Sequence, residues 1–216
     1  MQPTLTSRSE GDRDVPLLVW RLPGPHLAIS SGPLGGGIGA RGWVLNATVP
    51  MSYDRNDPDV HLLELADGLG LHGPGVGLMT GVDVGEVVAA TDGGVEAWAT
   101  VGLSTPTWAA ALEDGPAAVG TINIVVRVPA RLSEAALVNA VATVTEAKVQ
   151  ALFELGVAAT GTPTDAICVV CRPAGPVTAY GGPRSSWGAR IARAVHRVVL
   201  GGGTADRIPW SERPVR

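Results

Sequence analysis

Residues 121–171 read TINIVVRVPARLSEAALVNAVATVTEAKVQALFELGVAATGTPTDAICVVC. This segment opens with a run of β-forming residues over 121–128 and closes with a second apolar run over 166–171. Residues 133–155 lie between the two runs, contain no Gly or Pro, and repeat apolar side chains at helical spacing. A helix that joins two strands of one sheet makes those strands parallel. The segment therefore predicts a strand–helix–strand unit and an α/β fold.

Both ends of the expected helix carry specific signals. Ser133 is a suitable N-cap, and Glu134 complements the positive end of the helix dipole. Gly156 ends the helix. The apolar stripe that should face the sheet consists of Leu137, Val141, Val144, Leu152 and Leu155.

The rest of the chain alternates short β-like runs with Gly and Pro, which predicts many strands and turns. Strands are expected at 16–20, 26–30, 43–49, 75–82, 86–91 and 96–103, with the last three as antiparallel neighbours. Helices are expected at 57–69, with Leu62, Leu63, Ala66 and Leu69 inward, and at 186–200. Together these elements predict a layered α/β sandwich with mixed β-sheets and outer helices. We expect a single domain over 15–202 between flexible tails at 1–14 and 203–216.

The bulk composition limits the possible partners. The chain has 216 residues, 45% of them hydrophobic, which is enough for one well-packed domain. Its net charge is −4 and no basic cluster precedes the final helix, so nucleic acid is not an expected partner. No apolar run reaches the roughly 20 residues of a membrane span, and the polar N-terminus does not resemble a secretory signal. With only two cysteines, the sequence predicts a cytoplasmic protein.

Several common motifs are absent or out of context. Gly37, Gly39 and Gly42 match the dinucleotide pattern G-x-G-x-x-G, but an expected strand follows them in place of the required helix. They are therefore interpreted as a mobile loop near a site. Cys168 and Cys171 lie three apart on an expected strand, so they face opposite sides and are interpreted as packing residues. The four histidines have no metal-binding spacing, and no G-x-S-x-G elbow occurs.

Polar residues should meet at one edge of the sheet. If the strands at 121–128 and 166–171 are parallel, the turn 160–165 lies beside the start of the first strand, with Thr121 and Asn123. The second half of the helix, which carries Lys148, runs back toward the same edge. This convergence predicts a site rather than a plain connection.

The sequence leaves the role of each member open. Lys148 lies 11 residues after Leu137 and so within the apolar stripe, where it must snorkel, form an ion pair or serve a site. Asp165 is either a turn cap or part of the site wall. Glu146 lies on the opposite, polar face of the helix and is either solvated or functional.

Polar residues also interrupt other expected strands. Asn46 lies within WVLNATV and Thr80 within GLMTGV, where such side chains are less common. Several strands are therefore expected to contribute to one site.

Seven blocks carry a family resemblance. They are SSGPLGGG (30–37), WVLN (43–46), VGLMTGV (76–82), ATVGLSTP (99–106), GTINIVV (120–126), LSEAALVNAVATVTEAKVQAL (132–152) and TGTPTDA (160–166). In this order they resemble the adenosylcobinamide amidohydrolases of corrinoid salvage, over about residues 17 to 201. The resemblance implies hydrolysis of the amide between aminopropanol and a propionate side chain of the corrin, which gives adenosylcobyric acid for cobalamin precursor synthesis.

The same resemblance implies the partners. The substrate is a corrinoid small molecule whose cobalt belongs to the substrate, so no cofactor bound by the protein is expected. Two alternatives stay open: a corrinoid-binding protein without catalysis, and an amidase for a different substrate.

A more distant resemblance suggests the chemistry. The block G-T-I-N-I-V-V, followed by a Leu-rich helix and T-G…D-A-I, looks like part of the β-aminopeptidase and ornithine acetyltransferase-like N-terminal nucleophile enzymes. It implies self-cleavage between Gly120 and Thr121, with Thr121 as nucleophile, Asn123 or Asn46 as oxyanion donor and Lys148 as cation or base. Without self-cleavage, Lys148 or Asp165 would activate Thr121 or a water molecule. Expected substrate contacts are Ser31, Asn46, Thr80, Glu146, Thr160 and Thr162.

Overall fold

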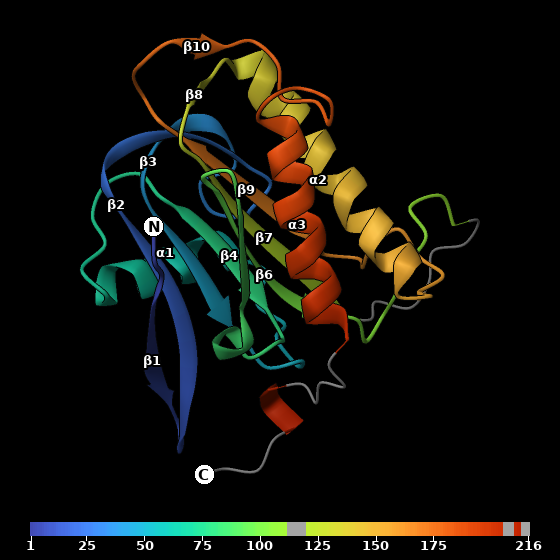
Figure 1. Cartoon of the computed structure of the whole chain (residues 1–216). Helices are drawn as coiled ribbons and strands as arrows, with labels where there is room; N and C mark the ends of the chain where they lie inside the picture. The colour runs from blue at the N-terminus through green and yellow to red at the C-terminus, as the bar shows by residue number, and fades with distance from the viewer. Residues whose placement is uncertain (112–119, 205–209, 213–216) are drawn as a thin grey trace.

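The computed structural model describes residues 1–111, 120–204 and 210–212, which build one large mixed sheet and three α-helices (Figure 1). The strands are hydrogen-bonded in the order β4-β3-β2-β9-β7-β6-β5, and β1 also pairs with β2. Their bounds are β1 Thr4–Glu10, β2 Arg13–Ser30, β3 Gly37–Thr48, β4 Val76–Thr80, β5 Val88–Asp92, β6 Val95–Gly102, β7 Thr121–Val128 and β9 Ala166–Cys171. The helices are α1 Pro58–Gly68, α2 Glu134–Glu154 and α3 Gly188–Gly203. Small additions are η1 Val84–Glu86, η2 Trp210–Glu212 and the parallel pair β8 Arg131–Leu132 and β10 Val177–Thr178.

The long strand β2 lets this sheet fold over on itself. Its first half pairs with β1 and β3, its second half pairs with β3 and β9, and the register with β3 shifts between Arg21 and His26. As a result β3 and β7 face each other across the interior, although β2 and β9 separate them in the hydrogen-bonded order. Side chains of both layers pack between them, including Leu18, Trp20 and Trp98.

The helices cover the two outer faces of this folded sheet. Alternate residues of β2, such as Leu17 and Val19, point outward into the same apolar cluster as Leu62 and Ala66 of α1, which packs on β3 and β4. On the other side α2 and α3 lie next to each other over β6, β7 and β9 (Figure 1). The result is four layers, α–β–β–α, which confirms the predicted layered α/β sandwich with outer helices.

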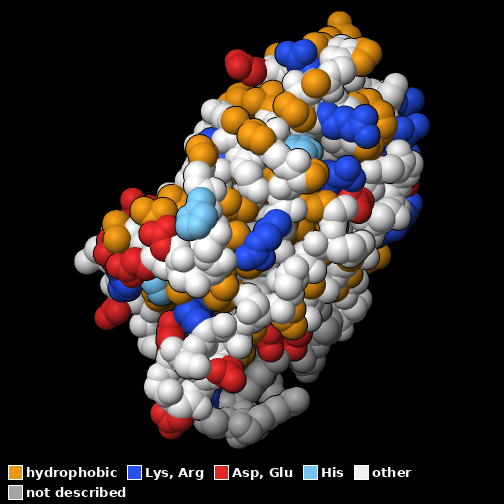
Figure 2. Space-filling view, turned by 90° about the vertical axis from the view of Figure 1, so that its left-hand side faces the viewer, with side chains coloured by type: hydrophobic (Ala, Val, Ile, Leu, Met, Phe, Trp, Pro, Cys, Tyr) orange, Lys and Arg blue, Asp and Glu red, His pale blue; other side chains and the backbone are white. Residues whose placement is uncertain are grey.

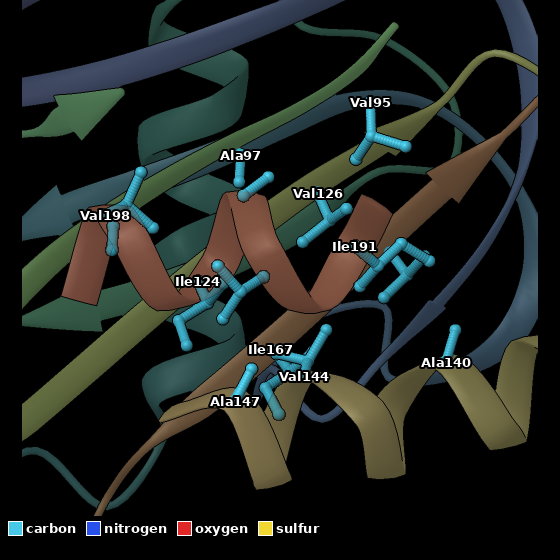
Figure 3. Close-up of a cluster of buried hydrophobic side chains, with 14 of the residues drawn as sticks. Val95, Ala97, Ile124, Val126, Ala140, Val144, Ala147, Ile167, Ile191 and Val198 are labelled. Carbon is cyan, nitrogen blue, oxygen red and sulfur yellow. The ribbon is translucent and has the colours of Figure 1, made fainter. Parts of the chain in front are cut away.

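The α2–α3 side holds the largest apolar cluster. Figure 3 shows side chains of β6, β7 and β9 pointing toward the two helices. Labelled members are Val95, Ala97, Ile124, Val126, Ala140, Val144, Ala147, Ile167, Ile191 and Val198, each no more than 8% exposed. Ser133 caps α2 as expected, because its hydroxyl accepts the Ala136 N–H at 3.1 Å.

The strand–helix–strand unit agrees closely with the sequence. Strands β7 and β9 have the expected bounds and run parallel, with Asn123 opposite Ala166. Cys168 and Cys171 face opposite layers, the first between the sheets and the second toward α2 and α3. Burial raises the pKa of the Cys168 thiol to about 12, which fits a packing role.

Other expectations were wrong. Residues 4–10 of the supposed N-terminal tail form β1, because their backbone pairs antiparallel with the first half of β2. The expected strands 16–20 and 26–30 are one strand, since the register shift accommodates Gly24 and Pro25. The strand at 75–82 is parallel to β3 and not a neighbour of β5.

Three smaller differences concern turns and exposure. Gly37, Gly39 and Gly42 lie within β3 and not in a mobile loop. Leu63 is 48% exposed, because α1 buries Leu62 and Ala66. Of the supposed C-terminal tail, Gly203 ends α3 and 210–212 form η2, while 205–209 and 213–216 lie outside the described residues.

Candidate active site

The starts of β7 and β9 lie side by side, and polar residues gather there. The parallel register places the turn 160–165 next to Gly120 and Thr121. Lys148, in the second half of α2, reaches this edge. The predicted convergence of turn, strand start and helix is therefore present in the structure.

Asp165 connects these segments. Its Oδ1 accepts the Ile122 N–H at 2.9 Å and the Thr162 hydroxyl. Its Oδ2 accepts the Thr162 N–H at 3.2 Å and pairs with the Lys148 ammonium group. One carboxylate thus connects the start of strand β7, the turn 160–165 and helix α2. Asp165 is therefore both a turn cap and a member of the cluster.

Lys148 is the only lysine in the chain; the other fifteen basic side chains are arginines. It is 7% exposed and lies in the buried stripe of α2, as its spacing from Leu137 predicted. Its neighbour Gly161 has no room for a side chain, because an added Cβ would lie 2.5 Å from Nζ and would overlap Asp165. A compact ammonium fits this space where a planar guanidinium would not.

Thr121 begins β7 and is 4% exposed. Its hydroxyl oxygen lies 2.5 Å from that of Thr164, whose hydroxyl also donates to the Gly120 carbonyl at 2.9 Å. Gly120 itself is tightly enclosed, since a Cβ there would meet the Thr105 nitrogen at 3.1 Å and Thr162 Cβ at 3.3 Å. The peptide bond before Thr121 is thus held in a defined position.

Two asparagines from the two sheet layers meet in the interior. Asn123 donates both amide hydrogens, to Asn46 Oδ1 and to the Met79 carbonyl, each at 2.8 Å. Asn46 donates to the Thr100 hydroxyl at 3.2 Å. Because the amide group of Asn has two hydrogens, Asn46 keeps one to donate and Asn123 keeps none. Of the two expected oxyanion donors, the geometry therefore favours Asn46.

The remaining expected residues are more dispersed. The Thr160 hydroxyl accepts the Ala109 N–H at 2.8 Å and ties the loop after β6 to the polar turn. Ser31 accepts the Ile167 N–H at 3.0 Å, and Thr80 accepts the Val82 N–H at 3.2 Å. Glu146 is exposed on the outer face of α2, which is the solvated alternative, and it does not join the cluster.

Sequence reasoning missed Thr164 and Thr100. Four polar residues follow one another closely in TGTPTD, and the sequence does not say which of them faces Thr121. The presence of one lysine among fifteen arginines was a usable signal for Lys148.

Within residues 1–111, 120–204 and 210–212, no group of three or more His, Cys, Asp or Glu side chains could hold a metal ion. Across those same ranges, none of the helices is long and apolar enough to cross a membrane. On the face that carries α1 and β2, basic, acidic and apolar side chains are interspersed (Figure 2).

The cluster contains three kinds of group that hydrolases use in acyl transfer. They are a hydroxyl at a strand start, an amide N–H donor and a buried ammonium–carboxylate pair. The sequence matches the adenosylcobinamide amidohydrolase family over residues 2–207. The chain belongs to this family, whose members are named for hydrolysis of an amide C–N bond.

Individual relatives agree with the family. The adenosylcobinamide amidohydrolase of Methanosarcina mazei is 33% identical over 190 residues, which cover 84% of this chain and 92% of that protein. A Halobacterium salinarum protein of the same name is 35% identical over 129 residues, 56% of this chain and 55% of the relative.

Two solved structures align with 93% of this chain and 82% of their own. They are a protein from Pyrococcus horikoshii OT3, 12% identical with a TM-score of 0.45, and a Burkholderia sp. beta-aminopeptidase, 10% identical with a TM-score of 0.42. Similarity at this level is too low to assign a shared chemistry.

Proposed function

We propose that this protein hydrolyses the amide between aminopropanol and a propionate side chain of adenosylcobinamide. The products would be adenosylcobyric acid, which re-enters cobamide synthesis, and free aminopropanol. Membership of the family over residues 2–207 carries the proposal. The cluster at the starts of β7 and β9 supplies suitable groups for the reaction.

In this proposal Thr121 is the nucleophile. Its Oγ attacks the amide carbonyl carbon, the C–N bond breaks, and the aminopropanol nitrogen takes up the proton that Oγ gave up. Water then hydrolyses the resulting ester, which returns the proton to Oγ and leaves the corrin propionate. After cleavage between Gly120 and Thr121, the free amine of Thr121 would act as the base in both steps.

The neighbouring side chains have supporting roles. Asn46 donates its remaining amide hydrogen to the oxygen that becomes negative in the tetrahedral intermediate, and Asn123 orients Asn46. Lys148 supplies a fixed positive charge, which Asp165 positions. If the chain is not cleaved, Lys148 or Asp165 activates Thr121 or water instead.

The proposal needs no cofactor from the protein, because the cobalt belongs to the substrate. Contacts to the scissile amide and the aminopropanol hydroxyl are assigned to Thr160 and Thr162, and further contacts to Ser31 and Thr80. A cytoplasmic location is part of the same proposal. Its support is that both cysteines are free thiols, as expected in a reducing compartment.

The test is incubation of purified protein with adenosylcobinamide, followed by mass analysis of the corrinoid. We expect adenosylcobyric acid and stoichiometric aminopropanol. A spectral change of the corrinoid without product would indicate a binding protein instead. Turnover of simple amides but not of adenosylcobinamide would indicate an amidase for another substrate.

A further inference from the structure

The hydroxyl of Thr164 has no part in the mechanism above, yet it touches two atoms that would react in self-cleavage. We propose that Thr164 is a catalytic residue of that cleavage, in which it relays the Thr121 hydroxyl proton to the Gly120 carbonyl oxygen. The inference rests on the proposed function, which takes Thr121 as a nucleophile that self-cleavage exposes.

The hydrogen bonds define the direction of the relay. A carbonyl oxygen only accepts, so the single hydroxyl hydrogen of Thr164 is donated to Gly120 at 2.9 Å. The short contact of 2.5 Å between the two threonine hydroxyls then requires Thr121 to donate and Thr164 to accept. The result is a continuous path from the Thr121 hydroxyl through Thr164 to the carbonyl of the bond that would break.

Burial makes such a relay necessary. Thr121 is 4% exposed and Gly120 is buried, so bulk water has little access to the hydroxyl proton. Thr164 is exposed and lies between this buried pair and the surface. Within the part of the chain that the structure describes, it is the side chain that hydrogen-bonds the Thr121 hydroxyl.

The surroundings fix the bond on both sides. The Thr105 backbone and Thr162 enclose Gly120, and Asp165 holds the N–H of Ile122, the residue after Thr121. Neither partner of the relay needs to move far, because the contacts already exist in the uncleaved chain. Holding the reacting groups in position in this way lowers the activation free energy of the cleavage substantially.

The chemistry balances with water as the only added reactant. Thr121 Oγ forms a bond to the Gly120 carbonyl carbon, and its proton passes through Thr164 to the carbonyl oxygen. The tetrahedral species then breaks its C–N bond as that proton is transferred to the nitrogen, which leaves an ester and a free Thr121 amine. Water hydrolyses the ester to the Gly120 carboxylate and restores the Thr121 hydroxyl.

The test follows cleavage between residues 120 and 121 by intact mass after synthesis of the full chain. Thr164→Val keeps the shape and removes the hydroxyl, and Thr164→Ser restores it. Thr145→Val is the matched control, because Thr145 is an exposed threonine of α2 whose hydroxyl donates to the Val141 carbonyl of the same helix at 3.0 Å. Far-ultraviolet circular dichroism establishes that each variant is folded.

We expect the wild type, Thr164→Ser and the control to be cleaved, and Thr164→Val to be cleaved at least about 10²-fold more slowly. Cleavage of Thr164→Val at the wild-type rate would overturn the relay. So would a wild type that stays intact, even if it hydrolyses adenosylcobinamide. If Thr164→Val does not fold, the Thr164→Ser variant decides. A folded Thr164→Ser protein that is not cleaved overturns the relay, and one that is cleaved supports the relay. Cleavage without corrinoid turnover would refute the proposed substrate and leave the relay standing.

Discussion

The two faces of β7 differ in chemistry. Toward α2 and α3 the strand presents Ile122, Ile124, Val126 and Val128, all of them at most 1% exposed. Toward the other sheet layer its first two positions are Thr121 and Asn123, and only then does Val125 follow. One face thus stabilises the fold along its whole length, while the other carries chemistry only at its start. Substitutions on the two faces should therefore have separable effects.

The largest effect is expected at Lys148. Replacing it by Met leaves the Asp165 carboxylate without its buried cation, which costs about 3–5 kcal/mol of stability. Turnover of adenosylcobinamide should fall about 10³-fold, since a positioned charge is lost. Lys148→Arg is the informative partner, because the space beside Gly161 excludes a guanidinium and this variant should also be impaired. A thermal melt and a rate assay check both; unchanged values for either variant contradict this role of Lys148.

On the apolar face the expected effect is on stability alone. Leu137→Ala removes a fully buried side chain from the α2 layer, and the free energy of unfolding should fall by about 2–5 kcal/mol. Turnover per folded molecule should stay at the wild-type value, because Leu137 lies in the first turn of α2, away from Lys148. Urea unfolding and the rate assay measure the two quantities. A loss of turnover in fully folded protein would show that the two faces are not separable.

At the site itself, Gly161→Ala sharpens the comparison. The added methyl group displaces the Lys148–Asp165 pair, and a displacement of about 1 Å can lower turnover by about 10²-fold. Gly68→Ala is the matched control, since a Cβ at this position, the end of α1, meets no atom of the described residues within 4 Å. Equal rates for the two variants would mean that the position of the pair does not matter to the reaction.

The smallest effect is expected at Glu146, two residues before Lys148. Glu146→Gln alters an exposed side chain on the outer face of α2, so stability should change by less than about 0.5 kcal/mol. The KM for adenosylcobinamide should not change measurably. A clear rise in KM would restore the sequence-based expectation that Glu146 contacts the substrate.

The sequence predicted the parts of the fold that depend on local pattern. The bounds of β7 and β9 and the extent of α2 followed from periodicity and the Ser133 cap. It did not predict β1, whose polar alternation resembles a tail until a partner strand is present. The parallel pairing of β4 with β3 was also missed, because it depends on contacts between distant segments.

For the candidate site too, the sequence predicted what depends on local pattern and missed what depends on contacts between distant segments. Thr121, Lys148 and Asp165 were expected together, since one parallel crossover places them at the same edge. Which of Asn46 and Asn123 keeps a free amide hydrogen depended on the hydrogen bonds across the two layers. The contact of Thr164 with Thr121 likewise depended on the exact course of the turn.

The most direct test of the central claim compares the wild type with Thr121→Ala on adenosylcobinamide, at equal concentrations of folded protein. We predict adenosylcobyric acid from the wild type and a rate at least about 10³-fold lower from the variant, because the nucleophile is absent. The far-ultraviolet circular dichroism spectrum of the variant should match that of the wild type, so that the loss of turnover is not a loss of folding. Turnover by Thr121→Ala at the wild-type rate would contradict the assignment of Thr121 as the nucleophile.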